Sequence, residues 1–208
     1  SQLEEARYLH SKGITVLLVD FRGCGKSSGN KTTIGYYEAI DVKSVYEWVK
    51  RRFPDSSIIL FGQSMGAAAI LRATAKFDIH PDGIIIESVF DNLRKTIENR
   101  FDAIGFPTFP SANLMIMWAK ILYKINVNEH NPVDYATHID CPILVMHGKQ
   151  DSRAKVDEGL SVYEHIASRN KKWVVFDGLG HESLIKGATI EWRQVMDDYV
   201  NAFNERKK

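Results

Sequence analysis

The chain has 208 residues, and its 27 Lys and Arg residues against 26 Asp and Glu residues give a formal net charge of +1. This near-balance argues against a nucleic-acid binder, which needs a surplus of basic residues on one face. The hydrophobic fraction of 44% is that of a globular protein. No apolar run approaches the roughly 18 residues of a membrane span. Two cysteines are too few for a disulfide scaffold. We therefore expect a reducing, cytoplasmic location.

Short, continuous apolar runs are typical of strands buried on both faces of a parallel sheet. The predicted strands are Ile14–Asp20, Ser57–Gln63, Gly83–Glu87, Pro142–His147 and Lys172–Asp177. The predicted helices around them are Glu38–Arg51, Met65–Lys76, Val156–Ser168 and Ser183–Phe203. This alternation predicts an α/β fold, a mostly parallel sheet with helices on both faces.

One segment interrupts the alternation. Residues 89–137 contain no predicted strand and two predicted helices, Asn92–Ile104 and Ala112–Ile125. We expect this segment to form a helical lid or cap inserted into a core of residues 1–88 and 138–208.

The second of these helices carries an apolar stripe at helical spacing. The stripe consists of Leu114, Met117, Trp118, Ile121, Leu122 and Ile125. Such a stripe usually packs into a core. A helical insertion above the carboxyl ends of the strands would also lie where ligands bind, so Met117 and Trp118 are candidate residues of an apolar substrate pocket.

The strongest functional motif is Gly62-Gln63-Ser64-Met65-Gly66, at a predicted junction of strand and helix. A sharp turn there would force Ser64 into a strained backbone conformation and lift its hydroxyl above the sheet. The residues two before and two after the serine pass close together and must be small, as Gly62 and Gly66 are. Because the helix points its N-terminal amides at the same place, the Met65 N–H is a candidate oxyanion donor.

A second copy of this pattern, at residues 25–29, lacks the context. The predicted strand before it ends at Asp20, and no helix is predicted to begin directly after it. The same stretch superficially resembles a P-loop, but that motif would need a glycine in the place of Asp20. We therefore take Ser64, and not Ser27, as the candidate nucleophile.

A serine hydroxyl needs a base to take its proton, and the base needs a carboxylate to orient it. The fourth and fifth predicted strands are followed by Asp151 and His181, at the sheet edge where Ser64 is expected. The chain order is serine, aspartate, histidine. Glu87 and Asp177 remain as alternative carboxylates, because each also lies at the end of a predicted strand.

These motifs together resemble the α/β-hydrolase superfamily, and within it the bacterial serine hydrolases that include esterases, lipases and S33-type peptidases. The matching stretches are residues 20–29, 62–66 and 141–151 and the pair Gly180-His181. The resemblance implies that Ser64 is the nucleophile, His181 the general base and then acid, and Asp151 its orienting partner. It also implies that the Met65 N–H is one of two oxyanion donors. The loop that contains Gly23 would shape the site beside it, as an oxyanion or substrate contact.

The resemblance also implies missing parts. The predicted strands resemble the fourth to eighth strands of the family's sheet, and Glu4–His10 resembles the helix that follows the third. We expect the earlier strands, and the His-Gly loop that supplies the other oxyanion donor, to lie upstream of Ser1.

Other potentially reactive residues fit non-catalytic roles better. Cys24 lies between basic residues that could lower its thiol pKa, but no base is tied to it by a recognisable spacing. His181 with the glutamate after it begins like a zinc-protease motif, but Ile185 stands where the second histidine would be. We predict no metal site and no cofactor.

The sequence thus predicts a serine hydrolase that cleaves a small-molecule carboxylic ester, acyl or aryl, with an apolar acyl group. The same groups would cleave an amide or a thioester, so a peptidase and a thioesterase remain open. A protein that uses this fold to bind a ligand or partner without turnover is the alternative from another class. No pattern in the chain indicates an oligomeric state.

Overall fold

The computed structural model describes residues 2–206. They form two compact units, one of residues 32–181 and one of residues 2–31 with 182–206. This division differs from the expected core and cap, because the predicted cap groups with the larger unit. None of the helices in the described part of the chain is long and apolar enough to cross a membrane.

The larger unit is built on a four-stranded parallel sheet in the order β1-β2-β3-β4. The strands are β1 (Ile59–Gln63), β2 (Gly83–Glu87), β3 (Ile143–Gly148) and β4 (Lys171–Phe176). All were predicted, with bounds shifted by two residues at most. Because the strands run the same way, their carboxyl ends meet at one edge, where Gln63 is paired with Glu87 and Gly148 with Phe176.

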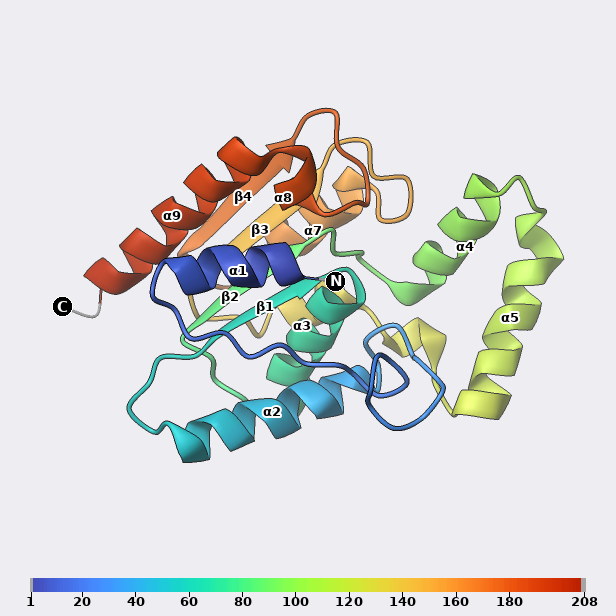
Figure 1. The fold of residues 1–208 in the computed structure, drawn as a ribbon. Coiled ribbons are helices and arrows are strands. Elements are labelled where there is room, and N and C mark those ends of the chain that lie inside the picture. The colour runs from blue at the N-terminus through green and yellow to red at the C-terminus, as the bar shows by residue number, and fades with distance from the viewer. Residues whose placement is uncertain (1, 207–208) are drawn as a thin grey trace. The chain divides into compact units, whose positions relative to one another are not determined.

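Helices of the larger unit pack on this sheet or on one another. They are α2 (Glu38–Arg52), α3 (Met65–Phe77), α6 (Pro132–Ala136) and α7 (Val156–His165). Helix α3 packs on β1 and β2, α7 packs on β3 and β4, and both α2 and α6 contact α3 (Figure 1). Small side chains let α3 approach closely, since Ala67, Ala68 and Ala69 are fully buried. The predicted α/β class is confirmed.

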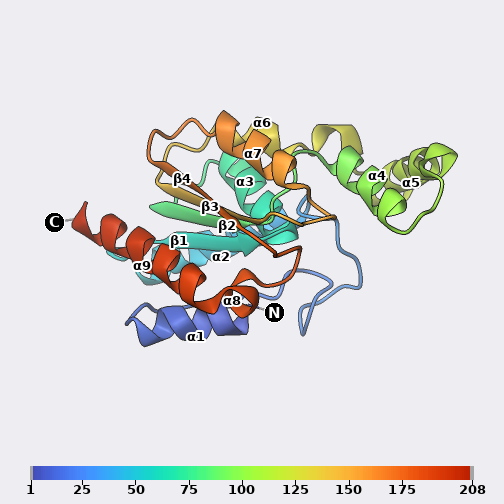
Figure 2. The same cartoon turned by 90° about the horizontal axis from the view of Figure 1, so that it is seen from above.

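No strand lies between β2 and β3 in the described chain, as predicted. Instead, α4 (Leu93–Ala103), α5 (Thr108–Tyr123) and the short 3-10 helix η1 (Val127–Glu129) follow one another. Helix α4 begins at Asn92, whose side chain accepts a hydrogen bond from the Lys95 backbone N–H. In both views α4 and α5 stand beyond the carboxyl ends of the strands, away from the sheet (Figures 1 and 2). We call α4, α5 and η1 the cap.

The apolar stripe of α5 faces solvent, which corrects the expectation that it packs into a core. The exposed members are Leu114, Met117, Trp118, Ile121 and Leu122, each between 46% and 59% exposed. The inward face carries Ala112, Ile116, Ala119 and Tyr123, which belong to a cluster with residues of α4. Because α5 is apolar almost all the way round, periodicity alone did not select its buried face. The face with two alanines lets α4 and α5 pack closely.

The smaller unit contains α1 (Leu3–Ser11), α8 (Leu184–Gly187) and α9 (Thr189–Glu205). Asp197 of α9 accepts hydrogen bonds from the Tyr8 hydroxyl at 2.6 Å and from Lys12 Nζ at 2.8 Å, which ties α9 to the end of α1. The single helix predicted for Ser183–Phe203 is interrupted at Ala188, where α8 ends.

The predicted strand Ile14–Asp20 does not form. The segment pairs with no described strand, and Leu17 and Leu18 are half exposed. A strand exists only where its backbone N–H and C=O groups find partners on a neighbour. The strand prediction was wrong because apolar composition does not supply that neighbour.

Candidate active site

Ser64 lies on a tight turn between β1 and α3. Its φ of 51° and ψ of −110° place it in a region that non-glycine residues rarely adopt, as the motif predicted. The Ser64 N–H donates to the Glu87 carbonyl at 2.8 Å, which fixes the turn on the end of β2. The serine is thus held above the carboxyl edge of the sheet by the backbone.

The glycine two residues before Ser64 is required by a close backbone approach. A Cβ at Gly62 would lie 2.6 Å from the carbonyl carbon of Gly66 and 2.8 Å from the Ala67 nitrogen. Distances this short are not tolerated between real atoms. The prediction that a small residue is needed is confirmed for Gly62 and stays a prediction for Gly66.

His181 bridges Ser64 and Asp151. Its Nε2 lies 3.0 Å from Ser64 Oγ, and its Nδ1 lies 2.7 Å from Asp151 Oδ2. A carboxylate can only accept, so the proton of the neutral ring sits on Nδ1, and Nε2 presents its lone pair to the serine hydroxyl. The three residues that the sequence placed at one sheet edge are therefore brought together in a hydrogen-bonded row.

Asp151 is held ionised by hydrogen bonds, two of which come from the backbone turn that follows it. Its Oδ1 accepts from the backbone N–H groups of Arg153 and Ala154 at 2.9 and 3.0 Å, which leaves Oδ2 for His181. Burial alone would raise the pKa of the Asp151 carboxyl, but the hydrogen bonds from His181 and the Ala154 N–H lower it below its ordinary value. The Asp151 side chain is fully buried, whereas His181 keeps 17% of its side chain exposed. The histidine is reachable from solvent and its carboxylate is not.

The loops that carry Asp151 and His181 are locked together. The Gln150 N–H donates to the Leu179 carbonyl at 2.7 Å, and the Lys149 N–H donates to the Phe176 carbonyl at 3.0 Å. Gly148 makes this possible, because a Cβ there would overlap the backbone carbonyl oxygen of Gly180. The spacing between acid and base thus depends on backbone contacts between neighbouring strand ends.

Helix α3 supplies amides beside the serine hydroxyl. Ser64 occupies the N-cap position of α3 and makes no capping bond with its side chain, so the first backbone N–H groups are not satisfied by a cap. The N–H of Met65, the predicted oxyanion donor, is the first of them. Gly23 lies in the smaller unit, where its φ of +70° and a hydrogen bond from its N–H to the Ser28 carbonyl define a tight turn. Its contribution to the site stays a prediction.

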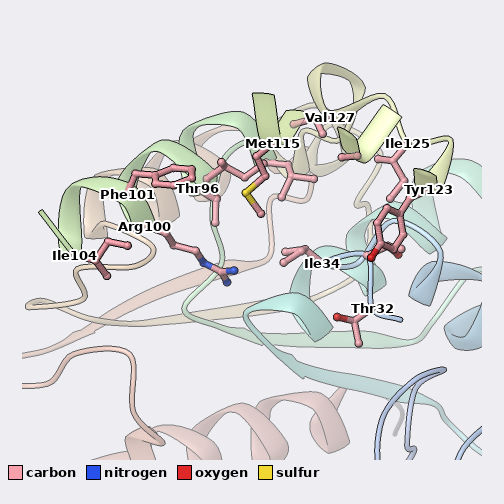
Figure 3. A pocket seen from close by; sticks show the side chains of 14 residues that line it. Thr32, Ile34, Thr96, Arg100, Phe101, Ile104, Met115, Tyr123, Ile125 and Val127 are labelled. Atoms are coloured by element: carbon pink, nitrogen blue, oxygen red, sulfur yellow. The ribbon is translucent and has the colours of Figure 1, made fainter. Parts of the chain in front are cut away.

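A cavity of about 380 Å³ lies between the two long cap helices and residues 32–34 (Figure 3). Its lining is Thr32, Thr33, Ile34, Leu93, Thr96, Ile97, Arg100, Phe101, Ile104, Met115, Ala119, Tyr123, Ile125 and Val127. Met117 and Trp118, the predicted pocket residues, are not among them, since they lie on the outward face of α5. Met115, Ala119 and Tyr123 form the α5 wall in their place.

The cavity and the serine turn are connected through packing. Ser64, Asp151 and His181 do not line the cavity. However, the cavity residues Leu93 and Ile97 belong to the same apolar cluster as Ala68, whose N–H donates to the Ser64 carbonyl at 3.0 Å. The cap cavity therefore shares an apolar cluster with the helix that begins at the serine.

A family model described as serine aminopeptidase, S33, matches residues 3–138, which is more than half of the chain. The chain belongs to the S33 family. The matched region includes the Ser64 turn and ends before Asp151 and His181, so those two residues stand on the geometry alone.

Curated relatives of this S33 chain include lysophosphatidylserine lipases. The ABHD12 lysophosphatidylserine lipase of Xenopus tropicalis is 26% identical over 93% of this chain and 52% of its own length. The human protein ABHD12B is 29% identical over 91% of this chain and 53% of its own length. The chain thus spans about half the length of these curated relatives.

Solved structures share the α/β-hydrolase fold. The Pyrococcus furiosus esterase Pf2001 is 26% identical with a TM-score of 0.74, covering 95% of this chain and 74% of the esterase. The Paleococcus ferrophilus monoacylglycerol lipase, with a TM-score of 0.71 and 16% identity over 97% of this chain and 89% of the lipase, shares the fold. The predicted fold class and superfamily are confirmed.

The alternative carboxylates of this S33 chain do not hold the histidine. Asp177 pairs with Lys149 at 2.7 Å, and its side chain is 82% exposed. Glu87 is buried at the end of β2, and its backbone carbonyl accepts from the Ser64 N–H. The Nδ1 of His181 is already occupied by Asp151.

A second, buried histidine supports the acid, and its place in the sequence favoured this structural role. His147 ends β3 with no exposed surface, and its Nε2 lies 2.8 Å from the Ala154 carbonyl, to which it donates. Burial lowers its pKa, so the ring is neutral. It therefore braces the turn that presents Asp151. The signal available was its place one turn before Asp151 at a strand end.

No three or more His, Cys, Asp or Glu side chains converge as a metal site anywhere in residues 2–206. Cys24 and Cys141 are both unpaired cysteines. Burial raises the pKa of the Cys141 thiol to about 12, so it is not a thiolate at neutral pH.

Proposed function

We propose that this chain is a serine hydrolase that cleaves carboxylic esters with an apolar acyl group through an acyl-enzyme intermediate. The observation that carries the proposal is the row of contacts from Ser64 Oγ to His181 Nε2, at 3.0 Å, and from His181 Nδ1 to Asp151 Oδ2, at 2.7 Å. A serine at hydrogen-bond distance from a base that is itself oriented by a buried carboxylate is the geometry of nucleophilic catalysis.

In the first half-reaction Ser64 Oγ attacks the ester carbonyl carbon while His181 Nε2 takes the hydroxyl proton. The buried Asp151 carboxylate stabilises the imidazolium that forms and keeps its ring in place. The tetrahedral oxyanion accepts from the Met65 N–H, strengthened by the N-terminal end of α3. His181 then gives the proton to the leaving alcohol, and the acyl group stays on Ser64.

In the second half-reaction water replaces the alcohol. His181 takes a proton from the water, whose oxygen attacks the acyl carbon, and returns the proton to Ser64 Oγ as the acid leaves. No cofactor is needed, because both proton transfers use the same imidazole.

The acyl preference is supported by the cap cavity, whose lining is apolar except for three threonines, a tyrosine and one arginine. The names of the relatives support an ester over an amide, since lysophosphatidylserine lipase and esterase are both ester-cleaving activities. The S33 description, serine aminopeptidase, is the observation that keeps a peptidase as the second candidate.

The test is hydrolysis by the full chain of 4-nitrophenyl esters from acetate to decanoate, beside amino-acid 4-nitroanilides. We expect ester cleavage that improves with chain length and then declines when the cavity is full. Ser64→Ala should lower kcat by about 10⁴-fold or more. Ser27→Ala is the matched control, since Ser27 lies in the other copy of the motif, and it should keep full activity.

Faster cleavage of the anilides than of the esters would make the chain a peptidase. No turnover of either class by folded protein would leave the non-catalytic binding protein as the better account.

A further inference from the structure

The segment before α2 holds a strained isoleucine against the cap cavity. Ile34 lines this cavity, and its backbone has a φ of +54° (Figure 3). A β-branched residue is a rare outlier in this left-handed region, which glycine and asparagine adopt more readily. Such strain persists only where the surrounding contacts impose it, and it marks positions whose side chain has a role.

A buried carboxylate imposes this conformation. Glu38, at the start of α2, is fully buried, and its Oε1 accepts from the Thr33 N–H at 2.7 Å. Its Oε2 accepts from the Thr33 hydroxyl at 2.6 Å and from the Gly35 N–H at 2.9 Å. From the cap, the Nε2–H of His130 donates to the Ile34 carbonyl at 3.0 Å. Residues 33–35, which we call the wall loop, are thus held from two sides.

The wall loop also packs on the helix that begins at the candidate nucleophile. A Cβ on Gly35 would lie 3.0 Å from the Met65 carbonyl oxygen and 3.0 Å from the Ala69 nitrogen, both in the first turns of α3. Ile34 itself packs against the apolar cluster that contains Ala68. The wall loop therefore has the cap cavity on one side and the start of α3 on the other.

We propose that Ile34 is a specificity-determining residue, which closes the α3 side of the cap cavity and so limits the length of the apolar chain that the cavity accepts. Glu38 is a positioning residue, because it holds the backbone on both sides of Ile34. The Ile34 side chain yields little to a longer chain, since β-branching restricts its rotation. That this chain is the acyl group of an ester rests on the proposed function; the wall itself does not.

The binding test needs no catalysis, because it uses alcohols that carry no ester. The full chain is titrated by calorimetry with hexan-1-ol, octan-1-ol, decan-1-ol and dodecan-1-ol. For the wild type we expect affinity to rise about fourfold per added methylene until the chain meets Ile34, and then to level off. Ile34→Ala should move this limit upward by about two carbons, because the wall loses most of its side chain. Ile34→Phe should move the limit downward.

Ile40→Ala is the matched control, because Ile40 lies on α2 of the same unit, is 38% exposed and is outside the cavity lining. It removes the same atoms and should leave the limit unchanged. Circular dichroism shows whether each variant is folded. An identical limit in the wild type, Ile34→Ala and Ile34→Phe would overturn the proposal, and so would an equal shift in Ile40→Ala. Folded wild type that binds none of the alcohols would overturn it as well.

The positioning role of Glu38 is tested by Glu38→Gln, which keeps the size of the side chain. Because the amide nitrogen cannot accept a hydrogen bond, the Thr33 hydroxyl or the Gly35 N–H loses its partner. We expect the wall to loosen, so that the ratio of decan-1-ol affinity to hexan-1-ol affinity rises about threefold. An unchanged ratio, with or without a lower melting temperature, would mean that Glu38 only stabilises the fold and would overturn its part of the proposal.

The hydrolysis test separates this proposal from the proposed function. With 4-nitrophenyl esters from hexanoate to dodecanoate, we expect the acyl optimum of the Ile34 variants to move in the same direction as the alcohol limit. The shift should appear in KM more than in kcat, because Ile34 bounds the chain and not the reacting atoms. Hydrolysis with one optimum in all variants would overturn the wall and leave the hydrolase standing. A shifted alcohol limit without cleavage of any ester would do the reverse.

Discussion

The loops at the sheet edge and the cap are held in place by different kinds of contact. Ser64, Asp151 and His181 follow β1, β3 and β4 of one parallel sheet, and hydrogen bonds from backbone N–H groups hold each loop in place. The cap rests on packing between two helices, and most of one face of α5 is exposed. The serine, histidine and aspartate are therefore fixed by backbone geometry, whereas the cavity to which the proposed function assigns substrate choice lies in a region with fewer constraints.

The largest loss of activity should come from removing the buried charge of Asp151, which orients His181. Asp151→Asn should lower kcat on 4-nitrophenyl hexanoate by about 10⁴-fold, because the amide no longer favours the proton on Nδ1. Asp177→Asn is the control and should have little effect, since Asp177 pairs with Lys149 at the surface. A loss of less than tenfold in Asp151→Asn would mean that another carboxylate, such as Glu87, serves the histidine.

Substitutions on the inward and outward faces of the cap should lower the free energy of unfolding by very different amounts. Leu93→Ala removes a side chain that is 3% exposed and should lower the free energy of unfolding by about 2–5 kcal/mol. Trp118→Ala removes a larger side chain that is 52% exposed and should cost about 0.5 kcal/mol or less. Urea unfolding measures both. Equal costs would mean that the α5 stripe is buried in the protein after all.

At the sheet edge, Gly62→Ala tests the close backbone approach beside Ser64. The added Cβ would lie 2.6 Å from the Gly66 carbonyl carbon, so the turn must shift, at a cost of about 1–3 kcal/mol. We expect Ser64 to lose activity in a protein that still folds, as measured by ester hydrolysis beside circular dichroism. An Ala variant with unchanged stability and activity would show that the turn does not need its glycine.

A buried carboxyl joins the two regions. Glu158 of α7 accepts from Asn99 Nδ2 of α4 at 2.5 Å, and its Oε2 has no hydrogen-bond partner in the described chain. Burial, followed by the charge of Asp91, raises the pKa of Glu158 from 4.5 to about 7, although Asn99 and the Lys95 charge oppose this. Folding therefore favours the protonated form.

The smallest effect we expect is a pH dependence from this carboxyl. Because its pKa is raised on folding, the stability it contributes is present below pH 4.5 and is lost as the pH rises through about 7. Glu158→Gln cannot titrate, so the melting temperature of the wild type relative to this variant should fall between pH 5 and pH 8. If the melting temperatures of the two proteins changed in parallel with pH, the raised pKa assigned to Glu158 would be wrong.

The sequence predicted the sheet edge well because its signals are local. A Gly-x-Ser-x-Gly turn after an apolar run, and Asp151 and His181 just past later runs, each describe a strand end that needs no knowledge of distant residues. The S33 family match covers the Ser64 turn, and the observed parallel sheet places the ends of β1, β3 and β4 at one edge.

The cap and the segment Ile14–Asp20 could not be predicted in the same way, because each depends on a partner. An all-round apolar helix does not reveal which face Ala112 and Ala119 will place against α4. An apolar run does not reveal whether a neighbouring strand exists.

The most direct test of the account is covalent labelling of the full chain with a fluorophosphonate, followed by mass spectrometry of the modified peptide. The account predicts one stoichiometric adduct on Ser64, absent in Ser64→Ala and greatly slowed in His181→Ala. Folded protein that takes up no label, or that takes it up on Ser27, would contradict the central claim that the row from Ser64 to Asp151 activates a nucleophile.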